Sequence, residues 1–153
     1  LKGLTVKFWN VYGIEKDMEK AHVITDFIRR GFEEGEFEML TDGTEQRQFL
    51  YAEDCCEALE TVMECYSDFK PEDPLHITSF NSTCIAKIAA LIQGQFNLIG
   101  RYDVKIKPGL AKDSVQMDKR NEADTYITGW WTPKTSIADG ITQVFAEMKK
   151  DYS

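Results

Sequence analysis

The stretch that decides the fold runs from Leu4 to Gly13 and reads LTVKFWNVYG. Its alternation and its β-branched and aromatic residues predict a strand that stops at a turn glycine. Asn10 is therefore expected at a strand end, which is where α/β folds place their ligands. A second stretch, from Asp42 to Asp54, reads DGTEQRQFLYAED and contains Arg47. Together the two stretches predict an anion-binding pocket with a polar floor at Asn10 and a cation at Arg47.

The composition describes one soluble globular domain. The chain has 153 residues, 42% of them apolar and 29% charged, and a chain of this length buries about 70% of its unfolded surface. Neither a membrane-spanning run nor a secretory signal is seen. The net charge of −8 opposes nucleic-acid binding. The four cysteines lack disulfide or metal-ligand spacing. We therefore interpret them as reduced thiols in a cytoplasmic protein and predict no metal site.

Hydrophobic periodicity outlines the elements. Apolar residues at spacings of three and four predict helices over 18–34, 54–69 and 84–95, a short helix over 118–128 and a last helix from 136. Residues 37–40 and 47–51 are predicted to form a hairpin, with further strands at 75–80 and 102–107. The stretch 110–117 has neither period and is expected to be a mobile loop over the site. About five helices and five short strands predict a mixed α/β (α+β) fold, with helices packed on a small mixed sheet.

Polar residues predict four helix starts, one of them at Asp118, which can cap the short helix over 118–128. Asp54, three residues before a glutamate, and Ser136, three residues before Asp139, both resemble capping boxes. Residues 81–83 read Asn-Ser-Thr. This matches a glycosylation site, but the chain shows no secretion signal, so we interpret it as a cap for the helix at 84–95.

The residues themselves specify no catalytic centre. His22 and His76 are too far apart in sequence to predict a ligand cluster. Two Tyr-x-x-x-Lys spacings begin at Tyr12 and Tyr66, but lysine is frequent enough here for chance to explain them. No glycine-rich phosphate loop and no G-x-S-x-G motif occur. We therefore predict neither a catalytic residue nor a dinucleotide site within this chain.

Four motifs in one order carry a family resemblance. They are KFWNVYG at 7–13, AHVI at 21–24, DG at 42–43 with RQFLYAED at 47–54, and GW at 129–130 with PKTSIADGI at 133–141. This order closely resembles the C-terminal part of NAD(P)-dependent nucleotide-sugar epimerases and dehydratases of the extended short-chain dehydrogenase/reductase family. The resemblance covers residues 4 to about 145. It implies that residues 1–153 are a single substrate-binding domain, a fragment of a longer enzyme whose Rossmann half carries the glycine-rich loop and the catalytic Tyr-x-x-x-Lys.

The resemblance also implies a site. The residues it assigns to the substrate are Asn10, His22, Val23, Arg47, Lys112 and Asp118. Phe8 and Trp9 fall where the family's first strand passes the nicotinamide. In such enzymes the arginine that matches Arg47 binds the diphosphate, and the loop that matches residues 112–118 closes over the nucleotide. A guanidinium fork suits this role, because each charged hydrogen bond is worth about 1.5–3 kcal/mol.

Four positions depart from the family pattern. The family usually has arginine at Lys7, proline at Ile14, asparagine at His76, and arginine or proline near Lys112. An ammonium holds phosphate as a point charge, without the fork of arginine. These departures leave the sugar, and the choice between epimerase, dehydratase and reductase, open.

The implied function is nucleotide-sugar binding within an NAD(P)-dependent epimerase or dehydratase. Its expected partners are a UDP-, GDP- or dTDP-sugar and the missing N-terminal Rossmann domain; a homodimer is left open. NAD or NADP is expected in the full-length enzyme and not tightly bound to this chain. The alternative is a standalone, non-catalytic module that binds a nucleotide-sugar or a partner protein. A weaker idea is an interaction domain that presents Trp130 and Trp131.

Overall fold

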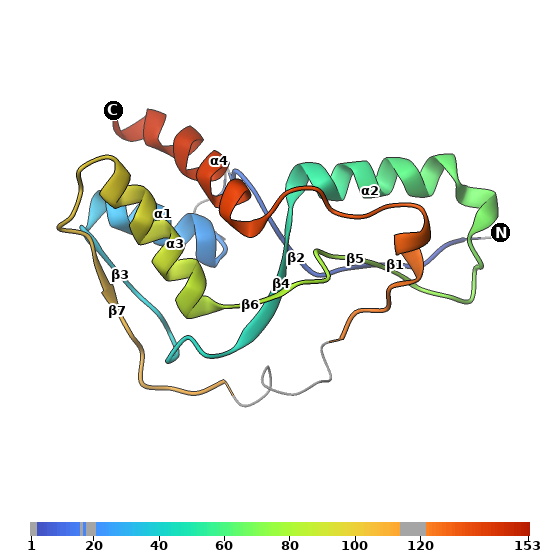
Figure 1. Cartoon of the computed structure of the whole chain (residues 1–153), viewed down its shortest axis with the longest axis horizontal. Coiled ribbons are helices and arrows are strands. Elements are labelled where there is room, and N and C mark those ends of the chain that lie inside the picture. Colours follow the sequence, from blue (N-terminus) through green and yellow to red (C-terminus); the bar gives the residue numbers. More distant parts are fainter. Residues whose placement is uncertain (1–2, 16, 18–20, 114–121) are drawn as a thin grey trace.

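The computed structural model describes residues 3–15, 17, 21–113 and 122–153, which form four α-helices and seven short strands (Figure 1). The helices are α1 (Val23–Glu33), α2 (Ala52–Glu64), α3 (Ile85–Leu98) and α4 (Ile137–Lys149). The strands are β1 (Val6–Phe8), β2 (Asn10–Tyr12), β3 (Glu36–Glu38), β4 (Gln46–Tyr51), β5 (Leu75–Ile77), β6 (Ser82–Cys84) and β7 (Lys105–Lys107). Single 3-10 turns lie at Tyr66–Asp68, Tyr126–Gly129 and Lys150–Tyr152. The described part of the chain contains no helix long and apolar enough to cross a membrane.

The strands form three small sheets. β1 pairs in parallel with β5, and β3 pairs in parallel with β7. In the third sheet β4 is central, parallel to β2 and antiparallel to β6. The expected mixed α/β fold is confirmed, with several small sheets in place of one.

The buried apolar side chains form two core clusters. One fills the space between α1, α3, α4 and the β2-β4-β6 sheet and includes Ile28, Phe37 and Phe96, all fully buried. The other lies between α2 and β5 and includes Leu75 and Trp131. The first predicted strand is interrupted between β1 and β2, so Asn10 begins a strand of a different sheet. The interruption therefore places Asn10 where the two clusters meet.

The predicted hairpin at 37–51 is wrong. β3 pairs with β7, and β4 pairs with β2 and β6, so the two strands do not pair with each other. The turn chemistry is nevertheless real: Gly43 has a φ of 77°, and the Asp42 carboxylate accepts hydrogen bonds from the backbone and hydroxyl of Thr44. The turn leads the chain from β3 into a strand of another sheet. This is because β3 pairs with β7, whereas β4 pairs with β2.

The helix starts were predicted with mixed success. The Ser136 cap is confirmed, since its hydroxyl accepts from the Asp139 backbone N–H at 3.1 Å. Asp54 does not cap α2; it lies buried in the first turn and accepts from the Thr135 backbone N–H at 2.8 Å. Residues 82–84 form β6 and provide no side-chain cap for α3, because pairing with β4 supplies their backbone with partners.

The remaining boundaries shifted. The helix predicted over 54–69 ends at Glu64, and the one predicted over 18–34 begins at Val23, with 18–20 outside the described residues. Of the helix predicted over 118–128, residues 122–125 are irregular and Tyr126–Gly129 form a 3-10 turn. Of the loop predicted over 110–117, residues 114–117 lie outside the described part, and Ala111 forms a bridge to Thr41.

Candidate functional site

A cavity of about 340 Å³ lies between β2, β4 and α1. Four of the six predicted substrate residues line it: Asn10, His22, Val23 and Arg47. They come from three separate segments of the chain, so only the fold brings them together. The volume falls in the range of small-ligand pockets.

Strand pairing fixes the two side chains at the base of this cavity. Asn10 lies opposite Phe49 in the parallel register, and Arg47 is two residues before Phe49 on the same face of β4. The Asn10 amide donates a hydrogen bond to the Gln48 carbonyl oxygen at 3.1 Å, which holds the amide in place. Asn10 is thus a fixed polar group next to a cation.

The Arg47 guanidinium is one-third exposed and forms one ion pair within the described part of the chain. Its Nη2 donates to the Asp113 carboxylate at 3.3 Å, with the side chains 33% and 22% exposed. That contact engages one nitrogen of a fork that carries five N–H donors. A ligand with several anionic oxygens could therefore use the remaining donors and compete with Asp113 for the one in use.

The N-terminus of α1 faces the same cavity and already holds an anion of the protein. His22 is its N-cap, and the His22 backbone N–H donates to the Glu15 carboxylate at 2.8 Å. The Thr25 hydroxyl and the His22 ring also contact this carboxylate. Burial alone would raise the pKa of Glu15, but these hydrogen bonds outweigh it and hold the pKa below its usual range. A ligand phosphate at this helix end would have to lie beside Glu15 or displace it.

Sequence reasoning missed further charged residues of the cavity: Asp26, Arg30, Glu38 and Glu45. Helical spacing could have found Arg30, because it lies seven residues after Val23 on the same face of α1. Glu45 is 4% exposed, and the Thr41 hydroxyl contacts both of its carboxylate oxygens, at 2.6 and 2.7 Å. The mixture of guanidiniums and carboxylates suits a ligand that carries anionic oxygens together with hydrogen-bond donors.

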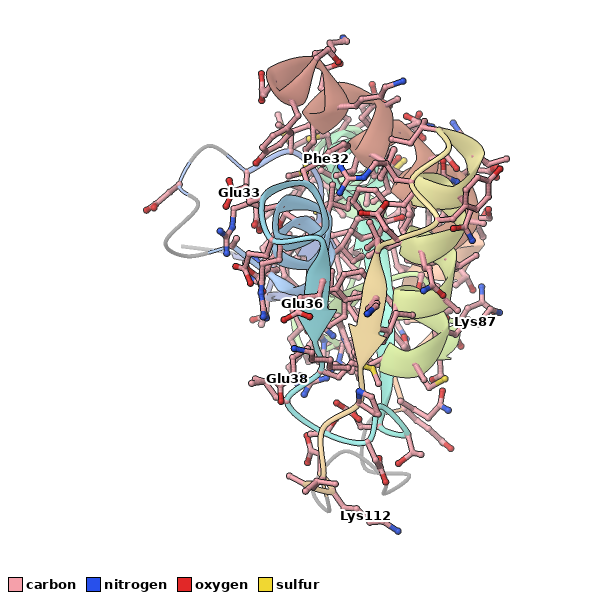
Figure 2. The ribbon with its side chains drawn as sticks, turned by 90° about the vertical axis from the view of Figure 1, so that its left-hand side faces the viewer. Phe32, Glu33, Glu36, Glu38, Lys87 and Lys112 are labelled. Atoms are coloured by element: carbon pink, nitrogen blue, oxygen red, sulfur yellow. The ribbon has the colours of Figure 1, made fainter. Side chains whose placement is uncertain are left out.

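The other predicted site residues lie elsewhere. Lys112 is exposed and does not line the cavity; Figure 2 shows it beyond the ends of β3 and β7. Asp118 lies outside the described residues. Phe8 and Trp9 do not line the cavity either: Phe8 is 55% exposed on β1, and the Trp9 ring packs against His76 with a centroid distance of 5.8 Å.

The described residues form neither a metal centre nor a catalytic pair from the Tyr-x-x-x-Lys spacing that begins at Tyr12. Tyr12 is buried, and burial, followed by the nearby Tyr51 and Asp54, raises the pKa of its hydroxyl far above the usual range. A Tyr12 phenolate is therefore not available as a general base, and Lys16, its partner in the motif, lies outside the described residues. Within 3–15, 17, 21–113 and 122–153, no group of three potential ligands is placed to hold a metal ion.

His76 ties the segment after residue 121 to β5. Its Nδ1 accepts a hydrogen bond from the Asp124 backbone N–H at 3.0 Å, which requires that nitrogen to be unprotonated. Burial, and then the nearby Lys7, lowers the pKa of His76, while Asp124 acts in the opposite direction. The neutral imidazole is therefore the form that the fold selects.

We expect protonation of His76 to destabilise the protein. Its folded-state pKa is lowered, so its contribution to stability is present above the unfolded value of about 6.5 and is lost as the pH falls through that region. The free energy of unfolding should drop between about pH 7.5 and pH 5.5 more in the wild type than in His76→Asn, whose Oδ1 accepts at either pH. Urea denaturation at both pH values measures this. An equal drop in the two proteins would contradict the assignment.

Comparisons with known proteins place this α/β chain in the extended short-chain dehydrogenase/reductase class. Residues 1–77 match the model of the NAD dependent epimerase/dehydratase family. The chain is 26% identical over 145 residues to the GDP-L-fucose synthase of Sinorhizobium fredii, covering 89% of this chain and 43% of that protein. It is 26% identical over 143 residues to GDP-L-fucose synthase 1 of Arabidopsis thaliana, covering 89% of this chain and 42% of that protein.

Solved structures share the fold. The UDP-glucose 4-epimerase of Thermotoga maritima, solved with UDP-glucose, superposes with a TM-score of 0.78 at 20% identity, covering 97% of this chain and 46% of that one. The UDP-glucuronic acid 4-epimerase of Bacillus cereus, in complex with UDP-glucuronic acid and NAD, gives a TM-score of 0.74 at 19% identity, with the same coverage.

This chain belongs to the NAD dependent epimerase/dehydratase family. The family resemblance drawn from the four sequence motifs is thereby confirmed. The chain spans 43% and 42% of the lengths of the two curated relatives described above.

Proposed function

We propose that this chain is the nucleotide-sugar-binding portion of an NAD(P)-dependent nucleotide-sugar epimerase or dehydratase. The observation that carries the proposal is the presence of Arg47 and Asn10 in one cavity, beside the N-terminus of α1. A guanidinium and a fixed amide favour anionic oxygens, and the helix N-terminus would add to them where a phosphate displaced the Glu15 carboxylate or lay beside it.

The diphosphate of a nucleotide-sugar fits this arrangement. It presents several anionic oxygens in a small volume, and the Arg47 fork can bind two of them at once. The chain's net charge of −8 does not oppose this strongly, because salt screens exposed carboxylates farther than about 8 Å away. The cavity carboxylates Glu38 and Glu45 can accept hydrogen bonds from the base or the sugar hydroxyls.

The nucleotide is a matter for experiment. The curated relatives described above are named for a GDP-sugar, and the two solved structures contain UDP-sugars. Each of these is a nucleoside diphosphate-sugar, which supports the class of ligand. A comparison of GDP-, UDP- and dTDP-sugars on the same protein distinguishes the bases.

The hydride chemistry in this proposal resides outside the chain. NAD(P) would accept and return a hydride when bound, and Phe8 and Trp9 would contribute only side contacts to it, since the sequence has no glycine-rich phosphate loop. Among the described strands β1 pairs only with β5, so its other edge can accept a strand of the proposed Rossmann half. The exposed Phe8 ring on β1 is consistent with such a junction.

Binding and turnover can be tested on the 153-residue protein. In isothermal titration calorimetry we expect saturable binding of at least one of GDP-mannose, UDP-glucose and dTDP-glucose, with dissociation constants between about 1 μM and 1 mM. With NAD added we expect no change in NADH absorbance. Robust turnover by this chain alone would refute the proposed division of labour. The absence of binding at millimolar concentrations of all three sugars would refute the proposed ligand class.

The alternative based on surface tryptophans receives little support. Trp131 is 6% exposed and belongs to the second core cluster, and Trp130 is 38% exposed and packs on Phe69 and Tyr126. The two rings therefore do not form a shared exposed patch.

A further inference from the structure

One charged side chain of the first cavity, between β2, β4 and α1, is almost completely buried. Glu45 lines this cavity together with Arg47 and is only 4% exposed. The Thr41 hydroxyl contacts both of its carboxylate oxygens, and no other described residue donates a hydrogen bond to them or forms an ion pair with them. A carboxylate has about four acceptor sites, and a hydroxyl supplies one proton. The described residues therefore leave most of the acceptor capacity of Glu45 unused.

A buried carboxylate with one donor favours a ligand that brings others. Removing an ionised carboxylate from water is costly unless hydrogen-bond donors or cations take the place of the water. The described residues supply Glu45 with the Thr41 hydroxyl, and the cavity is the side from which a ligand can reach it. A ligand that carries hydrogen-bond donors into the cavity would pair a group that the described protein pairs poorly.

The turn before β4 holds this carboxylate in place. The Gly43 backbone N–H donates to the Thr41 hydroxyl oxygen at 3.2 Å, so the hydroxyl accepts from the turn and donates to Glu45. The Gly109 N–H donates to the Thr41 carbonyl oxygen at 3.0 Å. The Ala86 N–H donates to the Gly43 carbonyl oxygen at 3.0 Å. The turn is thus anchored to two other segments of the chain, and a ligand that binds Glu45 would have little ordering to impose on it.

The other charged groups of the cavity are paired or solvated. Three of them form ion pairs within the protein: Arg47 with Asp113, Arg30 with Glu34, and Asp26 with Arg29. Glu38 is exposed, so solvent can hydrate its carboxylate. A second cavity, of about 490 Å³ between β6 and the starts of α3 and α4, has no carboxylate among its described lining residues. A buried carboxylate near a guanidinium is therefore a feature of the first cavity.

The spacing of Glu45 and Arg47 indicates which part of a ligand meets the carboxylate. The two residues lie two positions apart at the start of β4, and both line the cavity. In an extended chain this spacing is about 7 Å. A phosphate on Arg47 would therefore bring the ring next to that phosphate, and not a more distant group, to Glu45. In a GDP- or UDP-sugar this ring is the ribose or the hexose, and each carries vicinal hydroxyl groups that can donate to the two oxygens of one carboxylate.

We propose that Glu45 is a specificity-determining residue, which binds the vicinal diol of the ring joined to the phosphate on Arg47. The inference rests on the proposed function and adds a preference to it: a ligand whose ring lacks a hydroxyl of this diol binds more weakly. Ribose and hexose offer the same chemistry, so the experiment has one set of probes for each.

The test compares pairs of probes that carry the same charge and differ in the diol. For the ribose the pairs are GDP with 2′,3′-dideoxy-GDP, and UDP with 2′,3′-dideoxy-UDP. For the hexose they are GDP-mannose and UDP-glucose, each with its 2-deoxy analogue. In isothermal titration calorimetry of the 153-residue protein, we expect the diol form to bind about tenfold or more tightly in at least one set.

Replacement of Glu45 tests the cause of this preference. Glu45→Gln keeps the volume of the side chain, but its amide nitrogen cannot accept, so the preference should fall to about twofold or less. The lost charge acts equally on the phosphates of both probes in a pair, so the ratio of their affinities reports the diol. The set whose preference is lost identifies the ring. Glu60→Gln, on the exposed face of α2 and outside the cavity, should leave the ratio unchanged.

Two further variants separate binding from a structural role. Glu45→Asp keeps the charge and withdraws it by one methylene, so it should also reduce the preference, and it serves where Glu45→Gln does not fold. Thr41→Val removes the hydroxyl that contacts Glu45 and leaves the carboxylate, so it should retain the preference. A purely structural Glu45 would give Thr41→Val and Glu45→Gln similar losses of stability in urea unfolding and leave the preference unchanged in both.

The inference and the proposed function fail in different ways. Equal affinity of the wild type for both members of every pair would overturn the inference, and so would a preference that survives in Glu45→Gln and Glu45→Asp. In these cases the protein still binds nucleotides, and the proposed function stands. Failure of the wild type to bind any of the probes would count against the proposed function itself, and the inference would fall with it.

Discussion

Replacement of Arg47 by glutamine should weaken binding of a nucleoside diphosphate-sugar by about one to two orders of magnitude. The guanidinium lies in the candidate cavity beside Asn10 and is only one-third exposed. Charged hydrogen bonds of this kind are worth about 1.5–3 kcal/mol, and every 1.4 kcal/mol is tenfold in affinity. Isothermal titration calorimetry with the sugar that binds the wild type best measures the change.

Three further variants sharpen this result. Arg47→Lys keeps the charge and loses the fork, so its affinity should lie between those of the wild type and Arg47→Gln. Asp113→Asn removes the carboxylate that competes for the guanidinium, so it should bind a few-fold more tightly. Arg101→Gln makes the same substitution at a residue outside the cavity and should change nothing. Equal affinities of Arg47→Gln and Arg101→Gln would contradict the proposed role.

The largest expected loss of stability comes from Gly140→Ala, at about 2 kcal/mol. A Cβ at Gly140 of α4 would lie 1.9 Å from the Tyr12 hydroxyl oxygen and 2.8 Å from the adjoining ring carbon. Tyr12 is 4% exposed in the core, so β2 or α4 must move. Overpacking of this kind costs about 1–3 kcal/mol, partly offset by the better helix propensity of alanine. Urea or thermal unfolding measures the difference.

The cause can be isolated in a double-mutant cycle. Tyr12→Phe removes the oxygen involved in the clash, and that oxygen has no hydrogen-bond partner among the described residues, so the single variant should be close to neutral. Combined with Gly140→Ala it should restore most of the lost stability. Gly94→Ala on α3, where no atom lies within 4 Å of the added carbon, is the matched control and should be neutral or stabilising. Equal stability of Gly140→Ala and Gly94→Ala would refute the clash.

This contact also matters for the site. Tyr12 ends β2, and Asn10 begins the same strand. The close approach of glycine and tyrosine sets how near α4 lies to that strand, so the position of the Asn10 amide depends on a packing contact far along the sequence. A shift of β2 in Gly140→Ala would move both Tyr12 and Asn10, which lie at the two ends of the strand.

Local features were predictable because their causes are local. The α4 start depends on Ser136 and Asp139, which lie within one helical turn of each other, and the turn at Gly43 depends on a residue that tolerates positive φ. Asn10 and Arg47 came from the family motifs, and both line the cavity. The helix start and the turn needed only a few neighbouring residues, whereas the two site residues needed the order of four motifs along the chain.

The amino-acid sequence by itself determined the family, the four α-helices and the two side chains at the base of the first cavity. Tertiary structure alone decided which strands pair. The partners of β4 are β2 and β6, which are distant in the chain, and the three-residue β6 is too short to show a recognisable sequence pattern. It also decided the burial of Thr83 and Glu45, since the exposure of a polar side chain is set by what packs over it. The first cavity likewise exists only in the folded chain, because its lining residues come from separate segments that packing brings together.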